Sequence, residues 1–185
     1  MEKGSENRKD TILRKIVLTG PESTGKTTLA ERLAGYYNTI WVPEYAREYV
    51  RNLRRPYTYG DVIHIAQKQI EQLGTNYTKA HDYVFFDTGL IITKVWFAEV
   101  YQKFPDFLEK AIRKIHIDLY VLCSPDLPWR KDPIRENRGR NRKRLFTMYR
   151  NELETYGFKY EIVRGKGNAR INNALKCLER LSERN

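Results

Sequence analysis

Residues 16–28 read Ile-Val-Leu-Thr-Gly-Pro-Glu-Ser-Thr-Gly-Lys-Thr-Thr, and residues 20–27 fit the pattern G-x-x-x-x-G-K-[ST]. This pattern is typical of a phosphate-binding P-loop, whose glycines let the backbone turn tightly and aim successive N–H groups at phosphate oxygens. We expect Lys26 to reach the β- and γ-phosphates of ATP and the Thr27 hydroxyl to ligate Mg²⁺. The full set of residues expected to bind the nucleotide is Gly20, Glu22, Ser23, Thr24, Gly25, Lys26, Thr27 and Thr28.

The sequence on both sides of this loop supports the interpretation. Residues 15–19 form a short apolar run, as expected of a strand buried on both faces. After the loop, Leu29, Leu33 and Ala34 recur at helical spacing. Strand, glycine loop and helix therefore follow one another in the order that a P-loop requires, which disfavours a glycine-rich turn with a chance lysine.

The rest of the chain alternates apolar runs with helical patterns. Strands are expected at residues 15–19, 39–43, 83–87, 118–123 and 159–163. Strands that alternate with helices form a parallel sheet covered on both faces. The predicted fold is an α/β three-layer sandwich of the P-loop NTPase type, similar to nucleoside and nucleotide kinases, with a five-stranded parallel sheet. Asp61 is expected to be the N-cap of a helix that runs to about residue 79, and Trp96 and Phe97 are expected in the core.

Length and composition favour a single P-loop domain. With 185 residues, we expect one domain over residues 13–185, after a disordered leader at residues 1–12. No run of eighteen apolar residues and no signal peptide are present, so a cytoplasmic protein without a membrane span is expected. Cys123 and Cys177 have no metal-binding or redox spacing and are expected to be buried free thiols.

The net charge of +11 fits two classes of partner, nucleic acids and polyphosphates. The basic residues gather in two stretches, residues 47–55 and residues 130–144. No helix-turn-helix, zinc finger or aromatic-basic RNA motif accompanies them, so we expect a small-molecule substrate and no nucleic-acid partner. The sequence does not indicate an oligomeric state.

Two carboxylates follow predicted strands. Asp87 closes the apolar run at residues 83–87, which is the position of a Walker B aspartate that holds Mg²⁺. Its alternative role is an N-cap for the helix starting near Gly89. Glu44 follows the strand at residues 39–43, where a carboxylate can take the proton of an attacking hydroxyl or hydrogen-bond a ribose. Its alternative role is to start a helix, because the helix dipole favours an acid there.

Residues 124–141 are rich in arginine and proline and are expected to form a lid. A lid excludes water and can place an arginine on the moving phosphoryl group. Arg135 is the first candidate for this catalytic arginine, followed by Arg138 and Arg130. A solvated basic loop explains most of these charges individually. Thr88 stands where many P-loop motors have a water-activating glutamate, which favours transfer to a small acceptor over hydrolysis.

The P-loop, the Glu-Tyr-Ala-Arg-Glu-Tyr segment at residues 44–49, residues 65–69, residues 86–88 and residues 128–135 together resemble the ribosylnicotinamide kinase domain of the bifunctional bacterial NAD-biosynthesis proteins, an AAA-like group of P-loop kinases. The resemblance implies ATP-dependent phosphorylation of nicotinamide riboside to nicotinamide mononucleotide. It also implies that Glu44, Tyr45, Arg47 and Gln69 lie near the acceptor.

The chain departs from the bifunctional proteins in one respect. Their nucleotidyltransferase domain carries an His-x-Gly-His motif, whereas His64, His81 and His116 are isolated here. We therefore expect the chain to make the mononucleotide and not the dinucleotide. Two alternatives to this function are a P-loop kinase for another nucleoside-like acceptor and a nucleotide-dependent regulatory or nucleic-acid-associated ATPase.

Overall fold

A computed structural model describes residues 13–77, 82–132 and 139–183. The strands are β1 (Arg14–Thr19), β2 (Trp41–Val42), β3 (Tyr83–Asp87), β4 (Leu119–Cys123) and β5 (Tyr160–Val163). The helices are α1 (Lys26–Tyr36), α2 (Tyr45–Asn52), α3 (Tyr59–Gly74), α4 (Leu90–Tyr101), α5 (Asp106–Lys114), α6 (Arg140–Thr155) and α7 (Gly167–Glu183).

The five strands form one sheet in the order β2-β3-β1-β4-β5, and every neighbouring pair is parallel. All carboxyl ends therefore lie at the same edge of the sheet, where ligands bind in folds of this kind. In the register of β1 with β3, Leu18 lies opposite Asp87, so the P-loop leaves the sheet beside this aspartate. The predicted α/β fold with a five-stranded parallel sheet is confirmed.

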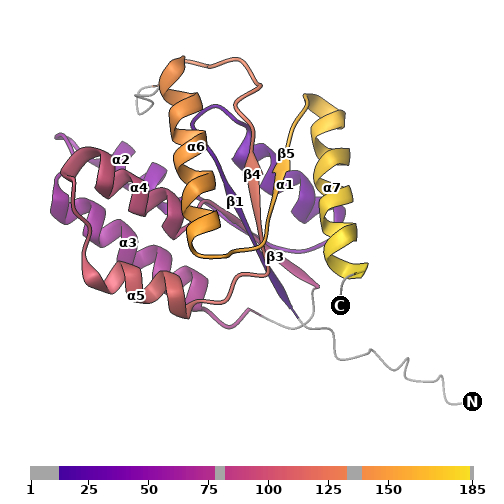
Figure 1. Cartoon of the computed structure of the whole chain (residues 1–185), viewed down its shortest axis with the longest axis horizontal. Helices are drawn as coiled ribbons and strands as arrows, with labels where there is room; N and C mark the ends of the chain where they lie inside the picture. The colour runs from indigo at the N-terminus through magenta and orange to yellow at the C-terminus, as the bar shows by residue number, and fades with distance from the viewer. Residues whose placement is uncertain (1–12, 78–81, 133–138, 184–185) are drawn as a thin grey trace, which may run out of the picture.

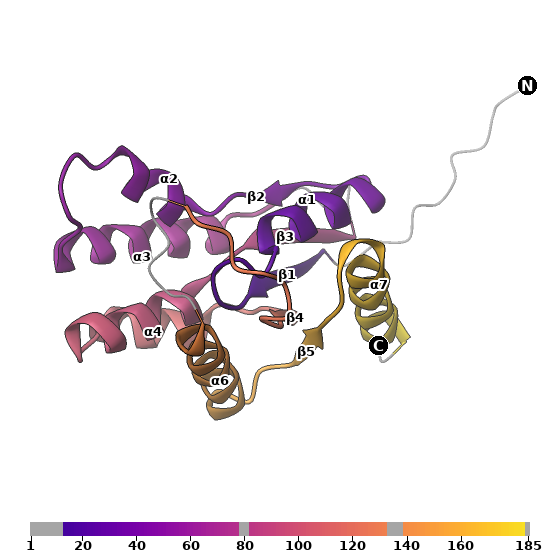
Figure 2. The same cartoon turned by 90° about the horizontal axis from the view of Figure 1, so that it is seen from above.

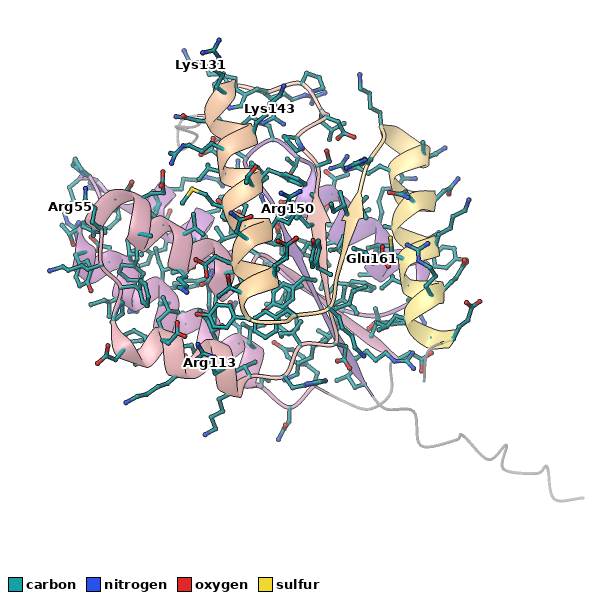
Figure 3. The ribbon with its side chains drawn as sticks, in the orientation of Figure 1. Arg55, Arg113, Lys131, Lys143, Arg150 and Glu161 are labelled. Carbon is teal, nitrogen blue, oxygen red and sulfur yellow. The ribbon has the colours of Figure 1, made fainter. Side chains whose placement is uncertain are left out.

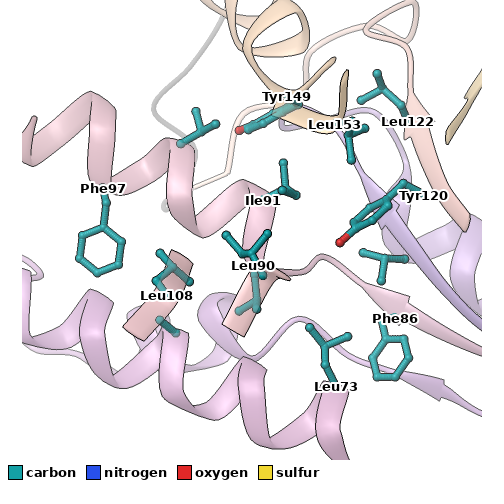
Figure 4. Packing of buried hydrophobic residues seen from close by; sticks show 14 of the residues in the cluster. Leu73, Phe86, Leu90, Ile91, Phe97, Leu108, Tyr120, Leu122, Tyr149 and Leu153 are labelled. Atoms are coloured by element: carbon teal, nitrogen blue, oxygen red, sulfur yellow. The ribbon is translucent and has the colours of Figure 1, made fainter. Parts of the chain in front are cut away.

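Helices cover both faces of the sheet (Figures 1 and 2). Alternate residues of each strand point to opposite faces. Ile16, Leu18 and Phe85 pack with α1 and α7 in one core. Val17, Phe86 and their neighbours pack with α3, α4, α5 and α6 in the other, which Figure 4 shows from close by. Burial on both faces explains why the strands read as continuous apolar runs.

The start of α3 differs from the sequence prediction. Thr58 is the N-cap, and its hydroxyl accepts a hydrogen bond from the Asp61 backbone N–H. Asp61 is the third helical residue, and its carboxylate bonds back to the Thr58 N–H, which completes a capping box. Both residues are good caps in isolation, so the sequence alone favoured the wrong one. The helix also ends earlier than predicted, at Gly74.

No helix within residues 13–77, 82–132 and 139–183 has the length and apolar character needed to cross a membrane. The leader predicted at residues 1–12 lies outside the described residues. The division into this leader and one domain stays a prediction.

Candidate active site

The P-loop follows β1 and leads directly into α1. Gly20 has a φ of 137°, and a Cβ there would lie 2.6 Å from the Cys123 carbonyl oxygen, so only glycine fits against the end of β4. Gly25 is the N-cap of α1 with a φ of 73°, a left-handed conformation that glycine adopts without strain. The Thr24 hydroxyl donates a hydrogen bond to the Pro21 carbonyl at 2.8 Å and closes the turn between them. The conformation of the P-loop is thus set by its two glycines and by a hydrogen bond within the loop.

Lys26 begins α1, and its ammonium group folds back over the loop. It donates hydrogen bonds to the carbonyl oxygens of Gly20 at 2.9 Å and Pro21 at 3.0 Å. A P-loop lysine acts by donating to phosphate oxygens. The two carbonyls therefore hold the ammonium group beside the position where phosphate is expected.

Asp87 and Thr27 meet at the start of α1. The Thr27 hydroxyl donates a hydrogen bond to Oδ2 of Asp87 at 2.5 Å. Asp87 is 3% exposed, and its Oδ1 is buried with no hydrogen-bond partner among the described residues. Burial raises the pKa of Asp87, while the charges of Lys26 and Arg47 and the Thr27 hydrogen bond act in the opposite direction. A buried carboxylate oxygen without a partner beside a hydroxyl fits a site for Mg²⁺, which prefers oxygen ligands.

Glu44 is the N-cap of α2 and points into the same site. Its carboxyl group lies against protein on most sides, and burial raises its pKa. The positive charge of Lys26 opposes that shift, whereas the negative charge of Asp87 adds to it. The Glu44 side chain makes no cap hydrogen bond to α2, so it remains directed at the site and is not used to start the helix.

Arg47 lies one turn along α2 from Glu44. Its guanidinium forms an ion pair with Asp132, in the segment of residues 124–132 that follows β4. Arg47 lines the same cavity as Lys26 and Glu44, and its positive charge opposes the burial that raises the pKa of Glu44 and of Asp87. The structure therefore brings Lys26, Glu44, Arg47 and Asp87 together at the carboxyl edge of the sheet.

The segment of residues 124–132, hereafter the β4–α6 segment, passes over the P-loop. The Arg130 N–H donates a hydrogen bond to the Ser23 hydroxyl at 3.1 Å. Arg142 of α6 is 6% exposed and donates to the carbonyls of Leu127 at 2.9 Å and Ser23 at 3.1 Å. Arg142 thus holds the P-loop and the β4–α6 segment together. Arg135 and Arg138, the other candidates for a lid arginine, lie outside the described residues.

Basic side chains surround this end of the molecule. Lys131 of the β4–α6 segment and Lys143 of α6 lie near the start of α6 (Figure 3). In Figure 1 the segment arches from β4 past the carboxyl edge of the sheet before α6 begins. Part of the net charge of +11 is therefore placed around the P-loop, where it attracts a polyphosphate.

A cavity of about 620 Å³ extends from the P-loop to the other end of α2 and to α4. At its far end the walls are largely apolar and aromatic. Tyr57 and Trp96 line that end, with ring centroids 4.9 Å apart and planes at 81°. Trp96 is half-buried and packs against the edge of the core while it lines the cavity, whereas Phe97 is fully buried in the core. The other residues that line this end are Val50, Arg55, Pro56, Ile92, Val95, Glu99 and Val100.

The loop that carries Tyr57 is held by one carboxylate. Asp61, 5% exposed, accepts hydrogen bonds from both terminal nitrogens of Arg55 at 2.6 and 2.9 Å. It accepts others from the Tyr49 hydroxyl at 2.8 Å and the Thr58 N–H at 2.7 Å. The Arg55 hydrogen bonds are the largest of the effects that hold the pKa of Asp61 far below its usual range. The sequence predicted Asp61 as a helix cap and did not indicate this set of hydrogen bonds, hereafter the Asp61 bracket.

Two residues predicted near the acceptor are not among those that line the cavity. The Tyr45 hydroxyl is 2.8 Å from Nε2 of His64, and Tyr45 is not among the residues that line the cavity. Gln69 is buried between α3 and α4, where its Oε1 accepts a hydrogen bond from the Thr93 hydroxyl at 2.5 Å. Neither side chain joins Glu44 in the structure.

Comparisons with known proteins agree with this fold. A family model described as an AAA domain matches residues 15–170. The chain is 26% identical over 181 residues to the trifunctional NAD biosynthesis/regulator protein NadR of Escherichia coli K12, over 93% of this chain and 43% of that protein. The chain therefore spans less than half the length of this curated relative.

Two solved structures resemble the fold. A crystal structure of NadR protein in complex with NAD and AMP-PNP has a TM-score of 0.76 at 23% identity and covers 92% of this chain and 49% of that one. A crystal structure of NadR protein in complex with NR has a TM-score of 0.73 at 22% identity, with coverage of 91% and 49%. At this identity the two structures establish the P-loop kinase fold.

Proposed function

The chain belongs to the AAA-domain family, and from this premise we propose that it is an ATP-dependent kinase for a small nucleoside-like acceptor, most specifically nicotinamide riboside. One observation carries the proposal. A cavity of about 620 Å³ joins a P-loop with its lysine, the Glu44 carboxylate after β2, and an aromatic pair at the far end, and Asp87 is hydrogen-bonded to Thr27 of the same loop. A phosphate donor and an aromatic acceptor fit at its opposite ends, with Glu44 between them.

The reaction needs an acceptor hydroxyl beside the γ-phosphate. Glu44 takes the hydroxyl proton, and its raised pKa makes it a stronger base than an exposed glutamate. The acceptor oxygen then forms a bond to the γ-phosphorus, while the bond from that phosphorus to the β,γ-bridging oxygen breaks and its electrons stay on ADP. Lys26 donates hydrogen bonds to the β- and γ-phosphate oxygens as charge shifts between them.

Thr27 and Asp87 are the residues that would hold Mg²⁺. The buried Oδ1 of Asp87 and the adjacent Thr27 hydroxyl offer oxygen ligands, and Mg²⁺ in such sites uses one or two protein ligands together with phosphate oxygens. The ion, when bound, neutralises charge on the phosphates. The Thr27 hydroxyl would keep its hydrogen bond to Oδ2 of Asp87, because its oxygen lone pairs and Oδ1 of Asp87 are the atoms that would face the ion.

The aromatic pair supports the assignment of the acceptor. Stacking of a heteroaromatic ring on an aromatic side chain contributes about 1–3 kcal/mol per ring. The nicotinamide of the riboside is also a cation, and the faces of Tyr57 and Trp96 attract cations. Glu99 lies at the same end and adds a negative charge, although Arg144 is paired with it. The name of the curated relative and the NR in one related crystal structure point to the same acceptor.

A panel of acceptors tests the proposal. Purified protein is given ATP, Mg²⁺ and nicotinamide riboside, adenosine, uridine or thymidine, and kcat/KM is measured from product formation. We expect nicotinamide riboside to have the highest kcat/KM. A higher kcat/KM for a neutral nucleoside would favour the second candidate, a kinase for another nucleoside-like acceptor, because stacking on Tyr57 and Trp96 is compatible with any base.

A nucleotide-dependent regulator or nucleic-acid-associated ATPase remains the candidate from a different class, favoured by the net charge of +11. It predicts ATP hydrolysis that DNA or RNA stimulates in a salt-sensitive manner. The proposed kinase predicts no such stimulation.

A further inference from the structure

Arg47 is placed to do more than bind an acceptor. It lies three residues after Glu44 on α2, so both side chains are on the same face of that helix. Its side chain lines the cavity between the P-loop and the aromatic end. Its charge acts on both Glu44 and Asp87, the two carboxylates that flank the expected path of the phosphoryl group. This is the junction where donor, acceptor and metal ion would meet.

The partner of Arg47 in the structure is a carboxylate from the opposite wall. Asp132 belongs to the β4–α6 segment, which Arg130 attaches to Ser23 of the P-loop. The Arg47 and Asp132 side chains are 29% and 18% exposed, so water reaches the ion pair in part. The Arg47–Asp132 ion pair therefore connects α2 to the β4–α6 segment, and as a partly exposed pair it is a contact of moderate strength.

We propose that Arg47 is the arginine that contacts the transferring phosphoryl group, and that Asp132 occupies its guanidinium until nucleotide binds. A guanidinium binds carboxylate and phosphate oxygens with the same geometry, so a phosphate can replace Asp132 without moving α2. The inference rests on the proposed function and adds to it a catalytic residue and the group that competes for it.

The chemical reason is the charge of the reacting group. As the acceptor oxygen bonds to the γ-phosphorus and the bridging oxygen leaves with ADP, negative charge is spread over the equatorial oxygens of the phosphoryl group. Lys26 approaches those oxygens from the P-loop, and Arg47 approaches them from the acceptor side. The proton of the hydroxyl goes to Glu44, whose pKa is raised by burial, and the charges of Lys26 and Arg47 oppose that shift.

A static ion pair is the competing explanation. If Arg47 only holds α2 against the β4–α6 segment, then removing either partner breaks the same contact, and Arg47 and Asp132 variants behave alike. If the proposal is right, the two variants have different effects. Loss of Arg47 lowers kcat because Arg47 assists the reaction, whereas loss of Asp132 tightens nucleotide binding because Asp132 competes for Arg47.

The test compares Arg47→Lys, Asp132→Asn and the double variant, with Arg51→Lys as the matched control on the exposed side of α2. We expect Arg47→Lys to lower kcat roughly 100-fold or more, since it loses the planar guanidinium. Asp132→Asn should keep kcat within about threefold and tighten binding of Mg²⁺–AMP-PNP about two- to fivefold, the range expected for a partly exposed ion pair. In the Arg47→Lys background the tightening should vanish.

Equal losses of kcat in Arg47→Lys and Asp132→Asn would overturn the proposal, as would an Arg47→Lys kcat within threefold of the Arg51→Lys value. Thermal unfolding of each variant checks that it folds, and Arg47→Gln replaces Arg47→Lys if that protein is unfolded. AMP-PNP binding needs no acceptor. If wild-type protein phosphorylates no acceptor, the proposed function fails, while tightening by Asp132→Asn that depends on Arg47 still decides the competition between Asp132 and nucleotide.

Discussion

The Thr27 hydroxyl and the Asp87 carboxylate share a hydrogen bond of 2.5 Å, which joins the first turn of α1 to the last residue of β3. The contact places a hydroxyl and a buried carboxylate side by side at the carboxyl edge of the sheet. It depends on the parallel register in which Leu18 lies opposite Asp87.

Asp87→Asn should weaken the dependence of the reaction on its metal ion. The amide removes the negative charge that attracts Mg²⁺, and we expect the Mg²⁺ concentration for half-maximal activity to rise roughly 10- to 100-fold. The measurement is initial rate against free Mg²⁺ at saturating ATP. Asp82→Asn makes the same change at an exposed residue just before β3 and should leave the titration unaltered. An unaltered titration in Asp87→Asn would show that this carboxylate does not hold the ion.

Glu44→Gln should lower kcat about 10²- to 10⁴-fold, because the amide cannot accept the hydroxyl proton. In the wild-type protein, activity should fall as the pH drops through the pKa of Glu44, which burial raises above 4.5. The residual activity of Glu44→Gln should lack that acid limb. The profiles of kcat against pH for the two proteins are the measurement, and an identical acid limb in both would exclude Glu44 as the base.

The same substitution should stabilise the fold. Between the ordinary pKa of a glutamate and the raised pKa of Glu44, the native state binds more protons than the unfolded state, so the free energy of unfolding falls as pH rises through this window. Glu44→Gln removes that loss. Its Tm should exceed the wild-type Tm at pH 8, and the difference should shrink as pH falls toward 4.5. A difference that grows at low pH would contradict the assigned pKa shift.

Trp96→Ala should weaken binding of the acceptor and leave binding of ATP unchanged. Loss of one stacking surface costs about 1–3 kcal/mol, so the KM for nicotinamide riboside should rise roughly 5- to 150-fold. The KM for ATP should stay within about twofold, and Trp96→Phe should recover most of the acceptor affinity. Steady-state kinetics with each substrate varied in turn makes the comparison. Equal increases in both KM values would mean that Trp96 supports the fold and not the acceptor site.

Asp61→Asn should produce a related effect from outside the cavity. The substitution weakens the hydrogen bonds of the Asp61 bracket to Arg55 and to the Thr58 N–H, and therefore displaces Tyr57, which lies between these two residues in the sequence. Misplacement of a positioning group by about 1 Å costs up to roughly 100-fold, and we expect this in the kcat/KM for the acceptor. Tyr49→Phe removes a single hydrogen bond to Asp61 and should have a much smaller effect. Loss of ATP binding in Asp61→Asn, measured with AMP-PNP, would contradict a role restricted to the acceptor end.

The sheet and the P-loop could be predicted from sequence because each depends on short-range patterns. A strand buried on both faces must be a continuous apolar run, and the turn before α1 requires glycine at positions 20 and 25. Asp87 and Glu44 follow such strands directly, so parallel topology places them at one edge. The assignment of Gln69 to the acceptor came from the resemblance and stays a prediction, and the structure shows its Oε1 accepting a hydrogen bond from Thr93 of α4.

Contacts between distant segments could not be predicted in this way. Arg47 and Asp132 are 85 residues apart, and nothing local marks them as partners. Trp96 belongs to a helical apolar pattern that a core residue and a residue of a cavity wall share. Only the structure, which places Tyr57 beside Trp96 at the cavity, distinguishes these two positions. Aspartate is a common helix cap, and this role explains Asp61 from sequence alone, so its hydrogen bonds to Arg55 and Tyr49 were not predicted.

The central claim is that a phosphoryl group moves from ATP to an acceptor hydroxyl in this cavity. The most direct test follows the label from ATP carrying ³²P at the γ-position, with wild-type protein, Lys26→Ala and Glu44→Gln, in the presence and absence of nicotinamide riboside. We predict that label appears in nicotinamide mononucleotide with wild-type protein only, and that little inorganic phosphate forms without the acceptor. Label that goes to inorganic phosphate at the same rate with or without acceptor would contradict the claim.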